Sequence, residues 1–190
     1  GGTITLSVNR STNVATFAAG AIFTDGNLAV AGGHGVFFGG AAGASGMTSQ
    51  LLDDYEEGTW TPVIAGSGGG AYTYTATATA RYTKIGNLVT LSASIANITT
   101  NGSGQSGYVQ IQGAPFAKGS STYATGAMEL SSGDMSNGQT FAAVSFVTAS
   151  ATTIMYVRQS GDNSAGADFP VTGINSGATD FNFTITYQTA

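Results

Sequence analysis

Hydrophobic and polar residues alternate over many short stretches of this chain. In the clearest run, residues 71–83, tyrosines and alanines occupy every second position and threonines fill most positions between them. Successive side chains of a β-strand point to opposite faces, so a period of two predicts a strand. The period recurs over 87–98 and 181–187, and shorter strands are indicated over 108–112, 123–130, 140–148 and 153–158. Turns rich in glycine, asparagine and serine separate these segments, as in a β-sandwich or jelly roll.

Residues 1–50 carry strand signals in shorter pieces, at 3–8, 15–18, 27–31 and 36–38. Each piece holds one to three large apolar residues, too few to offset an ordering entropy of roughly 1–2 kcal/mol per residue. We therefore expect three copies to wrap around a common axis as a slender, glycine-rich β shaft. The alternative is a disordered glycine-rich linker. The residues expected to face the trimer axis are Ile4, Leu6, Val8, Phe17, Leu28 and Val30.

The segment 51–62 joins the two regions and contains four of the ten acidic residues and the only tryptophan, Trp60. An N-cap at Thr48 or Ser49 and a stop at Gly58 allow a short helix over 50–55. We expect 51–58 to form a solvated acidic collar, with Trp60 packed against it. A hard-cation site or a carboxylate pair is an alternative for the collar, as is sugar stacking for Trp60. The collar residues are Asp53, Asp54, Tyr55, Glu56, Glu57 and Trp60.

Two motifs carry a family resemblance: LDDYEEGTWTP at 52–62 and RYTKIGNLVT at 81–90. Together they resemble the junction and first strands of bacteriophage tail-fibre and virion-appendage proteins. The resemblance covers roughly 51–116 and leaves the last seventy or so residues without a motif. It implies a homotrimeric virion component, extracellular when functional, that joins other virion proteins upstream. It also implies attachment to a host surface glycan or outer-membrane receptor.

Composition limits the chemistry that the chain can perform. Only 8% of the residues are charged, there is one histidine and there is no cysteine, so acid–base catalysis, disulfides and thiolate metal sites have few or no candidates. The net charge of −5 disfavours nucleic acid as a partner. No apolar run reaches the roughly 18 residues of a membrane span. The start at Gly1 shows neither a leader nor an initiator methionine, so we expect a fragment of a longer chain.

Strand-forming threonine, valine, tyrosine and phenylalanine are common in the chain, whereas strong helix formers are scarce. The fold class that we predict is therefore all-β. Residues 1–50 would form the trimeric shaft, 51–58 the acidic collar or short helix, and 59–190 a jelly-roll-like β-sandwich head.

We expect no enzymatic activity and no cofactor. His34 lies among glycines without a framed serine, and the sequence lacks the Gly-x-Ser-x-Gly elbow of hydrolases. Three copies of His34 could bind a metal on a trimer axis, as related fibres do through His-x-His runs, although this chain has no such run. A weak calcium site in the loop 159–170 is a further alternative. A surface cluster of Asp134, Asp162, Asp168 and Asp180 would instead favour a glycan depolymerase.

The remaining function is recognition by polar loops, which we place at 99–107, 117–122, 131–139, 159–170 and 173–179. Aromatic residues near these loops are candidates for stacking on a ligand, with burial in a core or interface as the alternative. A purely structural virion role, as a fibre spacer or capsid decoration, and a secreted adhesin or carbohydrate-binding module are the competing functions. The receptor-binding candidates are Tyr108, Tyr123, Asp134, Asn137, Tyr156, Asp162, Asn163, Asp168 and Phe169.

Overall fold

The computed structural model describes residues 27–31, 34–38, 45, 47, 49–52, 54–75, 79–102, 104–120, 123–136, 139–147, 151–162 and 164–189. The chain divides into two units, Gly1–His34 and Gly35–Ala190, and the second contains every strand of the described residues. The predicted all-β class is confirmed, because the one helical element among the described residues is a 3-10 turn, η1 (Val171–Gly173). No helix within the described ranges has the length and apolar character that crossing a bilayer requires.

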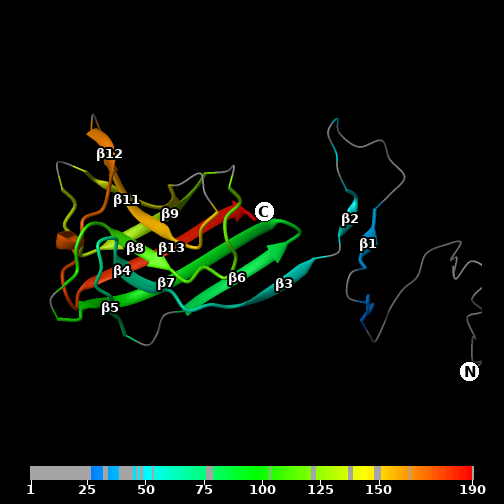
Figure 1. Ribbon diagram of the computed structural model, residues 1–190, viewed down its shortest axis with the longest axis horizontal. Helices are drawn as coiled ribbons and strands as arrows, with labels where there is room; N and C mark the ends of the chain where they lie inside the picture. Colours follow the sequence, from blue (N-terminus) through cyan, green and yellow to red (C-terminus); the bar gives the residue numbers. More distant parts are fainter. Residues whose placement is uncertain are drawn as a thin grey trace, which may run out of the picture. The chain divides into compact units, whose positions relative to one another are not determined.

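Two sheets form, and all their strand pairs are antiparallel (Figure 1). The smaller pairs β1 (Val36–Phe37) with β2 (Leu51–Leu52). The larger has the order β3-β6-β7-β13-β9-β10-β11-β8-β4, with β12 beside β11 and β5 beside β7. Its strands are β3 (Tyr55–Thr59), β4 (Val63–Gly66), β5 (Tyr72–Thr73), β6 (Thr79–Ile85), β7 (Leu88–Thr100), β8 (Val109–Gln112), β9 (Ala124–Ser131), β10 (Phe141–Phe146), β11 (Met155–Gly161), β12 (Ser164–Asp168) and β13 (Thr179–Gln188).

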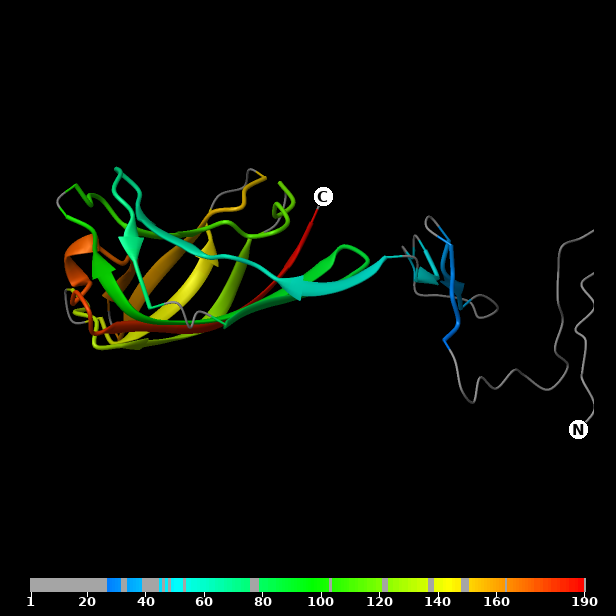
Figure 2. The ribbon, with the colours of Figure 1, turned by 90° about the horizontal axis from the view of Figure 1, so that it is seen from below.

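The larger sheet curls around one core, as Figure 2 shows. Its last strand in the sequence, β13, lies in the middle of the sheet between β7 and β9. Ala65 in β4 bridges Ala71, and the adjacent β5 pairs Tyr72 with Thr100 of β7. Gly66 N also donates to Gly70 O at 2.9 Å. We call this the closed end. The described strands outside β1 and β2 thus form one curled sheet in place of the two separate sheets of the predicted sandwich, and the contacts at the closed end pair part of the β4 edge.

Near the start of β7, the chain that follows β8 passes between the segment at Thr152 and the segment at Thr189. Lys118 forms bridges to both Thr152 and Thr189, and its N–H donates to Thr152 O at 2.8 Å. Gly119 N donates to Gln188 O at 2.7 Å, and Thr189 N donates to Asn87 O at 2.8 Å. These backbone bonds join four separate parts of the chain, and Lys118 is fully buried among them.

The core follows the alternation in the sequence. Val89, Leu91, Ala93 and Ile95 of β7 are all buried, and the residues between them face outward. In β13 the buried apolar residues are Phe181, Phe183, Ile185 and Tyr187. Gly86 and Asn87 form the hairpin turn between β6 and β7, with Gly86 at a φ of 58°.

The continuous strand predicted over 71–83 is wrong, because two separate strands form. β6 pairs with Leu88–Ser94 of β7, whereas β5 pairs with its far end, at Thr99 and Thr100. In between, β7 is irregular: Asn97 has a φ of 54°, and the register between β7 and β13 shifts at the same level. A period of two cannot reveal such a break, because both strands keep the same face inward.

The helix predicted over 50–55 is also wrong, because Leu51–Leu52 and Tyr55–Thr59 are strands. Glu56 pairs with Lys84 across β3 and β6, and the Lys84 ammonium contacts the Asp54 carboxylate. Gly58 lies opposite Tyr82, whose ring would be 2.8 Å from a Cβ at that position. Pairing with β6 therefore outweighs the local capping signal. Most of the expected collar is an edge strand, and Asp53 lies outside the described residues.

Trp60 is packed rather than exposed, but its ring partner is a core residue of β13 and not a collar residue. Its side chain is 8% exposed, and its ring meets that of Phe183 edge-on, with centroids 6.3 Å apart. The shaft stays a prediction. Four of its axis candidates, Ile4, Leu6, Val8 and Phe17, lie outside the described residues. The other two, Leu28 and Val30, are exposed in the single chain and belong to no strand.

Candidate ligand-binding face

The outer face of β9, β10, β11 and β12 carries a hollow beside polar and aromatic side chains. Val144 and Phe146 of β10 point into the core, so Ala143 and Ser145 point outward. Ser145 lies opposite Thr125 on one side and Tyr156 on the other. The strand register therefore assembles one surface from residues far apart in the sequence.

The hollow has a volume of about 460 Å³, and we call it the Tyr123 hollow. Ala143 and Ser145 have small side chains, which leave space between larger neighbours. The hydroxyls of Thr125 and Ser145 are 3.0 Å apart, and Ser145 Oγ also donates to Ala124 O at 2.9 Å. The Tyr123 side chain is 69% exposed. The lining residues are Tyr123, Thr125, Ala143, Ser145, Val147, Arg158, Gln159, Ser160 and Gly166.

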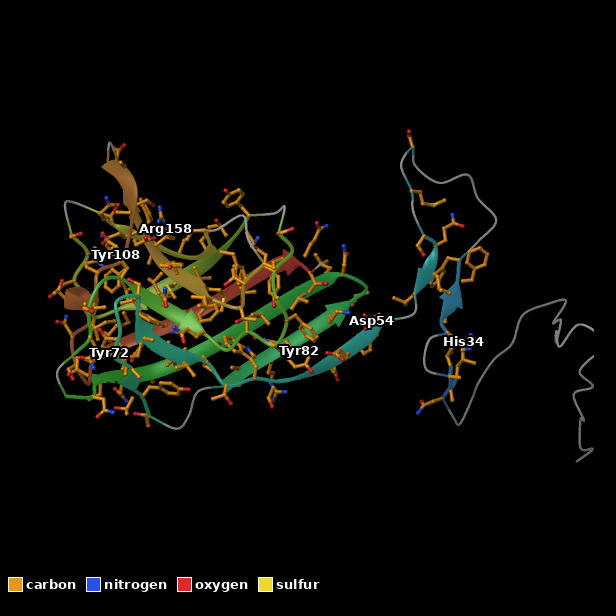
Figure 3. The ribbon with its side chains drawn as sticks, in the orientation of Figure 1. His34, Asp54, Tyr72, Tyr82, Tyr108 and Arg158 are labelled. Carbon is orange, nitrogen blue, oxygen red and sulfur yellow. The ribbon has the colours of Figure 1, made fainter. Side chains whose placement is uncertain are left out.

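An ion pair borders the Tyr123 hollow. Arg158 on β11 lies opposite Asp168 on β12, and its Nη1 donates to Asp168 Oδ1. The two side chains are 31% and 22% exposed, so they are partly shielded from water. Behind them, Gln159 Nε2 donates to Ser136 Oγ at 2.7 Å, and Ser136 N donates back to Gln159 Oε1 at 3.1 Å. These bonds hold β11, the strand that carries Arg158, which is labelled in Figure 3.

A second hollow, of about 630 Å³, lies on the same outer face, across β6, β7, β13 and β9. We call it the Asn182 hollow. Ser94 Oγ donates to Asn182 Oδ1 at 2.6 Å, and Asn182 Nδ2 donates to Glu129 Oε2 at 3.3 Å. β9 contributes Ala127 and Glu129 to this hollow, and Thr125 to the Tyr123 hollow. The two hollows are therefore neighbours on one sheet.

The structure brings together three of the predicted receptor-binding residues. Tyr123 lines the Tyr123 hollow. Tyr156 and Asp168 lie next to lining residues, because they pair with Ser145 and Arg158 across neighbouring strands. Tyr156 is partly buried, beside Ser145. Tyr123 is highly exposed, as a stacking residue needs to be.

The other candidates lie elsewhere. Tyr108 is 48% exposed beside the turn after β4, towards the closed end (Figure 3), and its N–H donates to Ser67 Oγ at 2.9 Å. Asp134 and Asp162 are exposed in separate loops. Asn137 and Asn163 lie outside the described residues.

Phe169 is wrong as a ligand contact, because its side chain is fully buried. Its backbone is bonded on both sides: Phe169 N donates to Val157 O, and Val109 N donates to Phe169 O, each at 2.8 Å. The ring packs so closely on Gly173 that a Cβ there would be 2.6 Å from it. The polar residues before Phe169 suggested a loop, whereas the chain forms β12 and then returns to the core.

Arg158, Thr125, Ser145 and Ser160 were not among the candidates from the sequence. The alternation within their strands places each of them on a polar face, but only the strand order brings those faces together. Among the described residues, no group of three or more His, Asp and Glu side chains is placed to hold a metal ion. Asp168 is paired with Arg158, and Asp180 accepts the N–H of Asn97 at 2.8 Å.

Burial raises the pKa of three tyrosines that pack within the fold, Tyr72, Tyr74 and Tyr187. The Tyr187 hydroxyl donates a hydrogen bond to Phe116 O at 2.8 Å. These hydroxyls therefore stay protonated at neutral pH, where they act as hydrogen-bond donors within the fold.

Comparison with known proteins identifies a shared fold. No protein-family model and no curated protein matches this sequence. Among solved structures, the crystal structure of the Dettilon tailspike protein is similar, with a TM-score of 0.55 and 19% identity. The similarity covers 70% of this chain and 24% of the tailspike chain. This chain therefore shares its fold with about a quarter of that tailspike.

Proposed function

We propose that this chain is part of a homotrimeric phage tail appendage that attaches the virion to a glycan on the host surface. The fold shared with part of a phage tailspike is the observation that carries the proposal. A second observation supports it: the two motifs that resemble tail-fibre proteins include strands β3 and β6, which pair directly. The resemblance thus falls on one structural unit of the sheet, although the motifs are separated in sequence.

The Tyr123 hollow is the attachment site that we propose. Its hydroxyls, its guanidinium and its exposed aromatic ring are the groups that bind a hydroxyl-rich ring by hydrogen bonds and stacking. The hollow is shallow and open, which suits a weak site that gains strength from repetition on one particle. We propose that this attachment does not cleave the glycan.

Assembly as a trimer is part of the proposal. Phe37 and Phe38 are 70% and 66% exposed in the single chain, and Leu28 is 59% exposed. Large apolar side chains that are exposed in a single chain can mark an interaction surface. Three copies of the chain would cover such residues in the shaft that we propose for 1–50.

The experiment compares two exposed tyrosines on an array of bacterial surface polysaccharides. Tyr123→Ala should weaken binding about tenfold, because the loss of an aromatic contact costs roughly 1 kcal/mol or more. Tyr108→Ala is the matched control, since it removes an exposed tyrosine towards the closed end; it should leave binding unchanged.

Three results would change the proposal. If Tyr108→Ala weakens binding and Tyr123→Ala does not, the site lies towards the closed end. If shortened glycan products appear on incubation, the protein is a depolymerase. If the folded protein binds no polysaccharide and no bacterial cell, the structural role in the virion is favoured instead.

A further inference from the structure

The charges around the Tyr123 hollow restrict the class of ligand that it accepts. Among the described residues that line it, Arg158 is the only charged one. Its charge is balanced by Asp168, which lies directly opposite on β12 and accepts a hydrogen bond from Arg158 Nη1. The hollow therefore has polar groups but no surplus positive charge.

The charges near the Tyr123 hollow also disfavour the binding of an anion. Glu129, four positions after Thr125 on β9, belongs to the neighbouring Asn182 hollow on the same outer face. The whole chain has a net charge of −5. An anionic ligand would lose water on entering the hollow without gaining an unpaired cation, and this loss is unfavourable.

The ion pair still leaves groups that bind neutral ligands. A guanidinium has five N–H donors in a planar fork, and a single carboxylate can take only part of them. The Arg158 side chain is 31% exposed, so water or ligand can reach it. The Ser145 hydroxyl donates to Ala124 O and contacts the Thr125 hydroxyl, so these two hydroxyls offer a ligand acceptor lone pairs. The Ser160 hydroxyl can both donate and accept, and the Tyr123 ring offers an apolar face.

On the basis of the function proposed above, we propose that the Tyr123 hollow selects an uncharged, hydroxyl-rich sugar, and that Asp168 sets this preference by neutralising Arg158. Uronic and sialic acids, which carry a carboxylate, would be rejected. Asp168 is thus a specificity-determining residue that acts through Arg158.

The test uses two probes with the same glycosidic linkage that differ only at C6 of each sugar unit: oligogalactose, with a hydroxymethyl group, and oligogalacturonate, with a carboxylate. The intact protein should prefer oligogalactose, with a dissociation constant that changes less than about twofold between about 0.05 and 0.5 M NaCl, because a neutral ligand is not screened. Asp168→Asn frees the Arg158 charge and should strengthen oligogalacturonate binding on the order of fivefold, in a salt-dependent manner. The melting temperature of each variant shows whether it is folded.

Asp134→Asn is the matched control. It removes one acidic charge from an exposed loop away from the hollow and should leave the affinities for both probes unchanged. A preference of the intact protein for oligogalacturonate, or an Asp168→Asn protein that is folded and unchanged in selectivity, would overturn this inference and leave the proposed attachment function intact. Binding to a protein receptor and to no glycan on the polysaccharide array would overturn both.

Discussion

Replacing Trp60 tests whether the junction segment 51–62 stabilises the sheet. Trp60 follows the edge strand β3, is 8% exposed and packs edge-on against Phe183 of the central strand β13. Truncation of a buried tryptophan to alanine costs about 3–5 kcal/mol. The indole N–H donates to Ser92 O at 3.4 Å, a long hydrogen bond that adds less than the typical ~1 kcal/mol. Most of the loss should therefore come from packing.

Trp60→Phe separates the two contributions. It keeps an aromatic ring next to Phe183 but loses volume and the N–H donor, so we expect a cost of roughly 1–2 kcal/mol. Urea unfolding followed by circular dichroism measures both variants, because neither retains the only tryptophan of the chain. In the intact protein, the fluorescence of Trp60 should be blue-shifted and should move to longer wavelength on unfolding.

Two observations would refute this reasoning. An unfolding midpoint that is the same for Trp60→Ala and the intact protein would show that the side chain contributes no packing energy. A fluorescence maximum of the intact protein that already matches the unfolded chain would show that the indole is solvated, and it would restore the sugar-stacking alternative for Trp60.

Two further predictions concern pH and assembly. Burial raises the pKa of Tyr187 in the fold, so its stabilising effect is complete below the unfolded pKa of about 10 and is lost as the pH rises above it. Tyr187→Phe should cost about 1 kcal/mol at neutral pH, where it loses the hydrogen bond to Phe116 O, and should lessen the fall in stability above about pH 10 in urea titrations; an equal fall in both proteins would contradict the assignment. Light scattering on the folded protein should give the mass of three chains, and a monomer mass at every concentration would exclude the trimer.

The strands that the sequence predicted best are those with a clean period of two and a strong apolar face. β7 and β13 alternate large buried residues with polar ones, and each is packed between two neighbours. In contrast, β12 consists of Ser-Ala-Gly-Ala-Asp and was assigned to a loop. It becomes a strand because it pairs with β11, and such pairing is not visible in local composition.

Strand order also explains which site residues could be found in advance. Tyr123, Tyr156 and Asp168 were candidates because of their residue types and the nearby loops. Arg158 was missed because it lies within a strand, and its role depends on Asp168 across the β11–β12 pair. The sequence separates these two residues by a turn, and only the register shows that they face each other.

The residues that stabilise the junction and those that line the Tyr123 hollow belong to different parts of the sheet. Gly58 opposite Tyr82, and Lys84 beside Asp54, join β3 to β6 at one edge. The hollow lies across β9, β10 and β11, and its lining residues follow the segment of tail-fibre resemblance. Because outward side chains of a sheet contribute little to the core that the inward ones form, the surface of the hollow can change without loss of the fold. The same pairing of β3 with β6 is therefore compatible with outer sheet faces that bind different ligands. For this reason, the resemblance in residues 51–116 does not identify a ligand.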